Sequence, residues 1–208
     1  MKKISIVFPL YNEQKRLDKL FKNIGKFNKA KKSKFCEFIF VDDGSMDATA
    51  KKISHFIHRN KNKKNNYKII RSSNNYGKGH ALKLGIKSSK YDWIFTMDAD
   101  LSVNLFQINN WIKKYNFKSD YAYFGSRNHP KSKIKFKYYR KIIGNILQIL
   151  VFLFVDKNIK DTQCGFKLYN KKYAKNTFSL LNENGFAHDI ELIFLLKRKR
   201  IKIKELPV

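Results

Sequence analysis

The feature that most constrains this chain is the alternation, over its first 127 residues, of short apolar runs with longer amphipathic stretches. Strands of a parallel sheet that are buried on both faces appear in a sequence as continuous hydrophobic segments. The segments expected as strands are 4–10, 37–41, 67–71, 93–97 and 121–124. Those expected as helices are 13–27, 48–59, 79–88 and 105–115. This order predicts an α/β fold with a doubly wound, mostly parallel, Rossmann-like sheet.

The length of 208 residues, with 43% hydrophobic residues, is enough for one substantial core and predicts a single domain. After Arg127 the rhythm changes. A basic loop, an apolar run at 142–155 and the segment 161–169 precede an expected helix near 188–197 and a last strand at 201–206. We interpret this second half as part of the same domain.

The charge is strongly basic, with 45 Lys and Arg against 16 Asp and Glu and a net charge of +29. Such a field attracts nucleic acids, anionic lipids and phosphorylated substrates without selecting among them. Lysine enrichment of solvated loops, as in the Lys/Asn tract at 60–66, explains the charge equally well.

The two cysteines, Cys36 and Cys164, are far apart and form no CxxC motif, and no apolar leader follows Met1. These features predict a reducing, cytoplasmic compartment. The apolar run from Ile142 to Val155 is shorter than the roughly 20 residues of a membrane-spanning helix. It fits either a core helix or a helix lying in a membrane interface.

Acidic residues gather around the ends of two expected strands, although acids are scarce in this chain. Six of the 16 carboxylates do so: Asp42, Asp43, Asp47, Asp92, Asp98 and Asp100. Open α/β sheets bind ligands beyond the carboxyl ends of their strands. A carboxylate cluster there is repulsive unless a cation or sugar hydroxyls satisfy it.

Asp98 and Asp100 follow the strand at 93–97 and offer two hard oxygen ligands to one site. Mg²⁺ or Mn²⁺ suits this pair, because these ions keep several waters and are completed by phosphate oxygens. The alternative is that one aspartate caps the helix expected from Leu105. The position at the end of a buried strand favours the metal site.

Three other strand ends offer groups for a nucleotide. Asp42 could accept hydrogen bonds from a base or ribose, and Pro9–Glu13 offers an aromatic face and a carboxylate. In Asn74–Gly79, the backbone amides and Lys78 are placed at a helix start where they could meet phosphate. Capping and turn formation are the alternatives for each.

With Pro9–Glu13, Val41–Ser45, Asn75–Gly79 and Asp98–Asp100 in this order, the chain resembles family 2 glycosyltransferases of the GT-A fold. Segments 125–127 and 160–168, with Arg140, are similar to the dolichyl-phosphate β-glucosyltransferase branch, whose near neighbours are mannosyltransferases. The resemblance implies one GT-A domain over residues 1–208. Residues 1–127 would be its nucleotide-sugar-binding half and 128–208 its acceptor-side half.

The resemblance also implies roles by position. The residues it assigns to the donor are Pro9, Tyr11, Glu13, Asp42, Lys78, Asp98 and Asp100. Of these, Asp98 and Asp100 would also hold the divalent metal. Those it assigns to the acceptor phosphate and sugar are Arg127, Arg140, Asp161, Gln163 and Asp189.

The expected reaction is one in-line displacement that inverts the anomeric carbon, moving a hexose, with glucose favoured, from a UDP-sugar to a polyprenyl or dolichyl phosphate. A phosphate acceptor is anionic near neutral pH, since its second pKa is about 6, and needs little base catalysis. Arg127 and Arg140 would hold it. The alternatives are a GDP-mannose donor or a sugar-hydroxyl acceptor; the latter requires a general base, Asp161 or Asp189. Capping of the helix near 188 is the structural alternative for Asp189.

The basic stretch 128–141, followed by 142–155, fits an interfacial segment at an anionic membrane surface. We therefore expect peripheral association with the cytoplasmic membrane face. A nucleic-acid-binding protein would explain the +29 charge. It would leave the acid clusters unexplained, because these would repel phosphates, and we expect no nucleic-acid partner.

Overall fold

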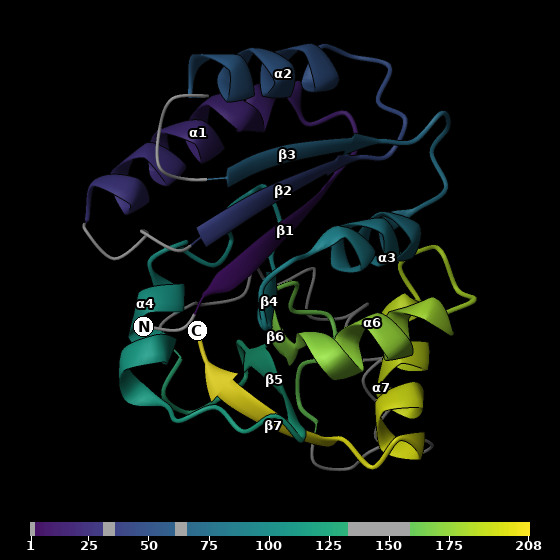
Figure 1. Cartoon of the computed structure of the whole chain (residues 1–208). Helices are drawn as coiled ribbons and strands as arrows, with labels where there is room; N and C mark the ends of the chain where they lie inside the picture. Colours follow the sequence, from purple (N-terminus) through teal and green to yellow (C-terminus); the bar gives the residue numbers. More distant parts are fainter. Residues whose placement is uncertain (1–2, 31–35, 61–65, 133–158) are drawn as a thin grey trace.

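The computed structural model describes residues 3–30, 36–60, 66–132 and 159–208. Strands and helices alternate through most of this chain (Figure 1). In chain order the elements are β1 (Ile4–Leu10), α1 (Gln14–Lys29), β2 (Cys36–Asp42), α2 (Thr49–Arg59), β3 (Asn66–Arg71), α3 (Lys78–Ser88), β4 (Trp93–Thr96), α4 (Gln107–Lys114), β5 (Tyr121–Ser126), β6 (Lys167–Asn170), α6 (Lys171–Ser179), α7 (His188–Arg198) and β7 (Lys202–Pro207).

The strands form one seven-stranded sheet in the order β3-β2-β1-β4-β6-β5-β7. The pairs β1–β2, β1–β4, β2–β3 and β5–β7 are parallel. β6 runs antiparallel to both of its neighbours, β4 and β5. The expected α/β fold with a mostly parallel sheet is therefore confirmed.

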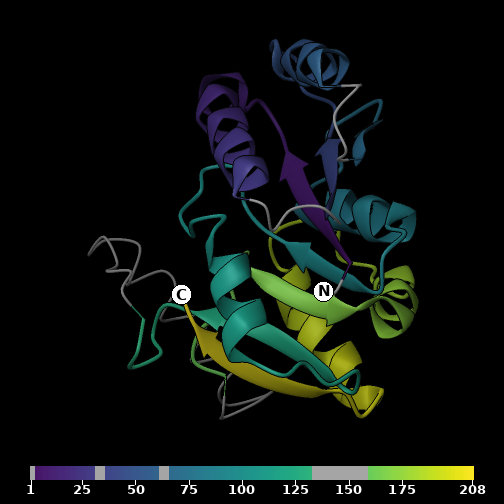
Figure 2. The same cartoon turned by 60° about the vertical axis from the view of Figure 1, so that its left-hand side comes forward.

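Helices cover both faces of the sheet, giving three layers (Figures 1 and 2). On one face, α1, α2 and α4 contribute Leu17, Ile53 and Trp111 to a common hydrophobic cluster. On the other, α3, α6 and α7 bury a second cluster that includes Leu82 and Phe178. This arrangement confirms the doubly wound architecture.

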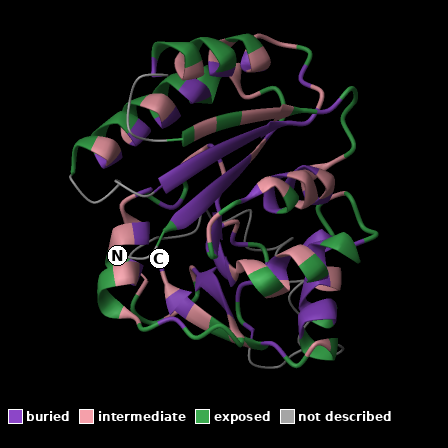
Figure 3. Ribbon diagram, in the orientation of Figure 1, coloured by how far each residue is buried: buried purple, intermediate pink, exposed green. Residues whose placement is uncertain are grey.

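The central strands are buried along almost their whole length and are mostly apolar because both of their faces are covered, as the burial colouring shows (Figure 3). In β2, Phe38 and Phe40 pack into the cluster under α1, while Ile39 and Val41 pack under α3. The edge strands β3 and β7 instead consist mainly of exposed and half-buried residues. Lysines on such edges discourage pairing with other chains.

The expected elements lie close to the observed ones, with two differences in the second half. β6 begins inside the segment 161–169, and α6 follows it where no helix is expected. A four-residue strand carries little periodic signal, and its place between β4 and β5 depends on pairing with residues far away in the chain. The apolar run at 142–155 lies outside the described residues.

Gly85 of α3 provides a test of how closely this helix packs on the sheet. A Cβ atom at Gly85 would lie 2.3 Å from Val7 Cγ1 and 3.0 Å from Val41 Cγ2. We therefore expect Gly85→Ala to lower the free energy of unfolding by about 1–3 kcal/mol, as overpacking does. Gly25 of α1 has no atom within 4 Å of such a Cβ, so Gly25→Ala should stabilise by about 0.5–1 kcal/mol. Urea unfolding followed by circular dichroism measures both, and equal gains would contradict the packing.

Candidate active site

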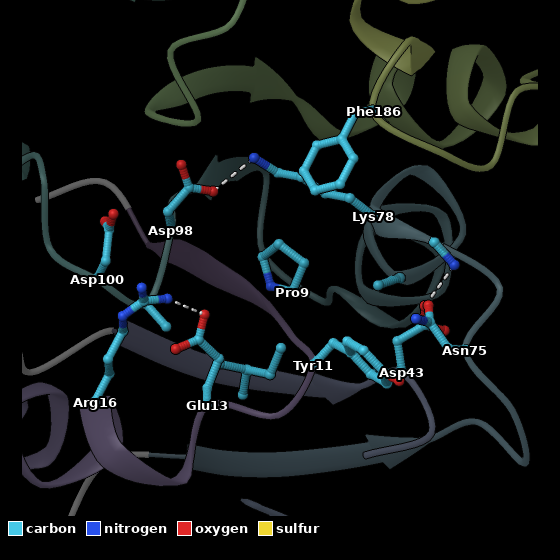
Figure 4. A pocket seen from close by; sticks show the side chains of 14 residues that line it. Pro9, Tyr11, Glu13, Arg16, Asp43, Asn75, Lys78, Asp98, Asp100 and Phe186 are labelled. Carbon is cyan, nitrogen blue, oxygen red and sulfur yellow. Dashed lines mark hydrogen bonds and ion pairs between the residues drawn. The ribbon is translucent and has the colours of Figure 1, made fainter. Parts of the chain in front are cut away.

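An open cavity of about 420 Å³ lies beyond the carboxyl ends of β1, β2 and β4 (Figure 4). This is the edge at which ligands bind in open α/β sheets. Its walls come from the end of β1, the loops that follow β1, β2, β3 and β4, the first turns of α1 and α3, and one distant residue, Phe186. The lining residues are Pro9, Leu10, Tyr11, Glu13, Arg16, Asp43, Asn75, Gly77, Lys78, Ala81, Asp98, Ala99, Asp100 and Phe186.

Six of the seven residues expected at the donor line this cavity: Pro9, Tyr11, Glu13, Lys78, Asp98 and Asp100. The seventh, Asp42, is fully buried and does not line it. Its carboxylate accepts a hydrogen bond from Ser45 N at 3.2 Å and lies 3.3 Å from Arg71 Nε. Asp42 thus supports the turn after β2 in this structure.

Asp43, the next residue, reaches the cavity in its place. Its Oδ2 accepts a hydrogen bond from Gly77 N at 2.6 Å, and its Oδ1 lies 3.3 Å from His80 Nδ1. Asp42 still belongs to β2, whereas Asp43 is the first residue beyond the strand. Neighbouring residues of an extended chain point in opposite directions, which separates the roles of these two aspartates.

Asp98 and Lys78 form an ion pair in the lining of the cavity, with Lys78 Nζ 2.7 Å from Asp98 Oδ1 (Figure 4). Burial alone would lower the pKa of the Lys78 ammonium, but the nearby carboxylates of Asp98 and Asp189 outweigh it and raise the pKa. Lys78 therefore stays protonated and positively charged at neutral pH. Gly165 closes the other side of Asp98, since a Cβ there would lie 2.3 Å from Asp98 Oδ2.

Asp100 and Glu13 add two carboxylates on the same side of the cavity. Asp100 Oδ1 accepts a hydrogen bond from Ser102 N at 2.8 Å, a local turn that aspartates commonly stabilise. Neither Asp98 nor Asp100 caps α4, whose N-cap is Phe106, so the capping alternative is wrong. Burial raises the pKa of Glu13; Arg16, at 2.7 Å, opposes this, and Asp100 and Asp98 raise it further.

This crowding of negative charge is what a divalent cation would relieve, and the donor set fits Mg²⁺ or Mn²⁺. In the described residues, no three His, Cys, Asp or Glu side chains gather closely enough to hold a metal by themselves. Asp98 and Asp100 are thus the residues that could hold one, together with water and a phosphate-bearing ligand.

The backbone amides at the start of α3 have protein partners. Gly79 N donates to Asn184 O at 2.7 Å, His80 N donates to the same oxygen at 3.2 Å, and Gly77 N donates to Asp43. These three amides are therefore engaged within the protein in this structure, and phosphate binding at the start of α3 stays a prediction. The Lys78 side chain does reach the cavity.

Of the residues expected at the acceptor, Arg127 is held by Asp161. Its Nε lies 2.7 Å from Asp161 Oδ2 and its Nη2 2.8 Å from Oδ1, and its backbone N donates to the same carboxylate. Asp161 is buried. Gln163 is exposed, and Arg140 lies outside the described residues.

Asp189 lies beneath the cavity, in a small hollow shared with Lys78 and Asp98. Its Oδ1 is 2.5 Å from Lys167 Nζ and 3.3 Å from His188 Nε2, and all three residues are buried. Burial alone would raise the pKa of Asp189, but Lys167, His188 and Lys78 lower it, so the carboxylate is ionised. The capping alternative is wrong here too, since the N-cap of α7 is Ala187, which makes no side-chain cap.

Asp92 and the two cysteines do not line the cavity. Asp92 precedes β4 and lies 3.6 Å from Lys171, at the opposite edge of the sheet, so it does not belong to the acid cluster. Cys36 and Cys164 are free and buried, and burial raises the pKa of each thiol to about 12. Neither is a nucleophile at neutral pH.

The sequence did not indicate three of the lining residues, Arg16, Ala81 and Phe186, and the most distant of them in the chain is Phe186. Its side chain is 79% exposed and lies above Lys78 (Figure 4). It belongs to the loop that leads into α7, more than 80 residues from Asp98. A single phenylalanine in a short loop carries no pattern, so only the tertiary structure identifies it.

Among the described residues, no helix is both long and apolar enough to cross a bilayer. Comparison with known sequences matches residues 5–178 to the family described as glycosyl transferase family 2. A dolichyl-phosphate beta-glucosyltransferase of Dictyostelium discoideum is 35% identical over 99% of this chain, and one of Homo sapiens is 34% identical over 100%. The chain spans 65% and 67% of the length of these two relatives.

Solved structures with the same fold include a mannosyltransferase from Pyrobaculum calidifontis in complex with GDP-Man and Mn²⁺. It has a TM-score of 0.66 and 15% identity, covering 99% of this chain and 55% of its own. Mannosyl-3-phosphoglycerate synthase from Rubrobacter xylanophilus has a TM-score of 0.67 and 13% identity, covering 100% and 65%. At these identities the similarity shows the fold, and the GT-A expectation is confirmed.

The buried pair of Asp189 and Lys167 predicts a pH-dependent stability. Because the folded-state pKa of Asp189 is lowered, its stabilisation is present above the unfolded pKa of about 4 and is lost as the pH falls through the folded-state pKa. Asp189→Asn should lower the free energy of unfolding by about 3–5 kcal/mol at neutral pH, because it leaves Lys167 buried without its charged partner. The loss should be smaller in acid. Urea unfolding at several pH values measures this.

The matched control is Asp18→Asn. Asp18 pairs with Lys52 at 2.7 Å, but its side chain is 75% exposed, so the change should cost less than about 1 kcal/mol. A similar cost for both variants would show that burial does not strengthen the Asp189 pair.

Proposed function

The chain belongs to glycosyl transferase family 2, and from this we propose that it transfers a hexose, with glucose favoured, from a UDP-sugar to a polyprenyl or dolichyl phosphate. The names of the similar full-length relatives support this reaction. The observation that carries the proposal is the cavity in which Asp98, Asp100 and Lys78 meet beyond the strand ends.

The donor would lie across this cavity. Tyr11, Asp43 and Asn75 gather at one end, away from Asp98 and Asp100 (Figure 4). We assign that end to the nucleoside and the acidic end to the diphosphate. Asp98 and Asp100 would hold Mg²⁺ or Mn²⁺, and the solved relative with Mn²⁺ supports a divalent ion. When bound, the ion stabilises the charge that develops on the departing diphosphate.

Lys78 would add a second positive charge beside the diphosphate. In the present structure its ammonium neutralises Asp98 at 2.7 Å. If Asp98 held a metal, the Lys78 ammonium could leave this carboxylate and bind the phosphate oxygens of the donor instead. A short displacement of one ammonium therefore suits both states of the site.

The acceptor is more consistent with a phosphate than with a hydroxyl group. Both candidate bases are ion-paired, Asp161 with Arg127 and Asp189 with Lys167. Burial alone would lower the pKa of Arg127, but Asp161 and, more weakly, Asp98 raise it, so this guanidinium is positively charged. Arg127, oriented by Asp161, would attract an anionic acceptor, which needs no base because it is already ionised.

The variants Asp98→Asn and Asp100→Asn should each lower metal-dependent transfer at least about 100-fold, as loss of a group that stabilises the departing charge does. Transfer is measured with UDP-glucose, GDP-mannose and UDP-N-acetylglucosamine against a polyprenyl phosphate, and chelation of the metal should abolish it. Asp92→Asn, at the other end of β4, is the control and should leave transfer unchanged. Lipid-linked product from GDP-mannose alone would replace the glucose assignment, and no product from any donor would refute the proposal.

The pH dependence of transfer separates the two acceptor classes. With a polyprenyl phosphate, the rate should rise as the pH increases through about 6, where the acceptor loses its second proton. A hydroxyl acceptor served by Asp189 should show no such rise, because the pKa of Asp189 is lowered and the carboxylate is ionised throughout. Initial rates between pH 5 and 8, at saturating donor, test this expectation.

A further inference from the structure

The outer side of α7 carries an apolar strip that continues from the cavity. Phe186 is 79% exposed and Phe194 is 58% exposed, and the half-buried Ile190 lies between them. Residues four apart share one side of a helix, so Ile190 and Phe194 extend the line that Phe186 begins. α7 lies at the border of the molecule, outside the sheet (Figure 1).

The loop that presents Phe186 is fixed by hydrogen bonds. The Glu191 carboxylate accepts from Asn182 N at 3.0 Å and from Glu183 N at 2.7 Å. Asn184 O accepts from the amides that begin α3, and Gly185 N donates to Glu183 Oε1 at 2.6 Å. The loop thus holds an apolar ring in the open, although burial would stabilise it more. Such a position is typical of a binding surface.

The charge of this surface is positive. Four consecutive basic residues, Lys197–Arg200, stand at the end of α7, directly after Phe194 and its turn. Two of them lie in the last helical turn and also stabilise the helix dipole. Two acids of this region, the exposed Glu183 and the half-buried Glu191, are engaged by backbone amides of the loop. An anionic partner with an apolar interior is therefore complementary.

We propose that the strip of Phe186, Ile190 and Phe194, with Lys197–Arg200 beside it, docks on an anionic lipid bilayer. Aromatic rings favour the interface of a bilayer, and basic residues favour its phosphates. A nucleic acid would use the positive charge but not the apolar strip. A second copy of this chain would bring two positive surfaces together, which repel each other.

This inference rests on the proposed function for its consequence. Phe186 belongs both to the strip and to the wall of the cavity. Docking of α7 would therefore place the mouth of the cavity beside the bilayer, where a lipid phosphate could reach Arg127 and the donor without leaving the membrane.

Flotation of the full chain with vesicles tests the docking surface. The wild-type protein should float with phosphatidylcholine vesicles that contain phosphatidylserine, and salt should weaken this. Phe194→Ser should lower the bound fraction several-fold, and a double change of Lys197 and Arg198 to Ser should remove the preference for phosphatidylserine. Leu180→Ser, which alters an exposed residue at the end of α6, is the control and should bind like the wild type.

If Phe194→Ser and the double variant both bind vesicles like the wild type, the proposed docking surface is refuted. A change of Phe194→Ser from dimer to monomer in gel filtration would refute it as well, since it would assign the strip to a second copy. Thermal unfolding of each variant shows that it is folded. Transfer to a short-chain, water-soluble phosphate should survive in Phe194→Ser, so an enzyme that transfers but does not float separates this inference from the proposed function.

Discussion

Burial of the central strands on both faces is the constraint on which the rest of the structure depends. β1 and β2 lie between two hydrophobic clusters. A polar side chain on these strands is buried, which is costly unless it finds a hydrogen-bond partner. Ser5 and Glu37, near the amino ends of the two strands, meet this requirement together, because the Ser5 hydroxyl donates to the Glu37 carboxylate at 2.7 Å. At the carboxyl ends the polar groups open into a cavity instead. Ligand chemistry is thereby confined to one edge of the sheet.

At that edge, a series of alternating charges connects the cavity with the buried layer under α7. Asp98 contacts Lys78, and Asp189 lies near Lys78 while it contacts Lys167. Each charge is compensated by the next, which allows buried ions that would be costly alone. Lys78 is held between two carboxylates, so a ligand or metal at Asp98 changes the balance of the whole series.

The two halves of the chain meet at the same carboxylate. Gly165, from the second half, packs so closely on Asp98 that no side chain fits there. The loop before α7 binds the start of α3 through Asn184 and places Phe186 over the cavity. Residues 159–208 therefore contribute to the same cavity as the strand ends of the first half. In the proposed arrangement, this shared wall is also where the protein approaches the membrane.

The sequence by itself determined the α/β class, the order of elements in the first half and most of the candidate donor site. These depend on local signals: strands buried on both faces are apolar throughout, and parallel strands bring their ends to one edge. Only the tertiary structure decided that Asp43 rather than Asp42 lines the cavity, that Asp189 is paired with Lys167, and that β6 runs antiparallel. Side-chain direction and pairing between distant residues are set by packing, which no local pattern records.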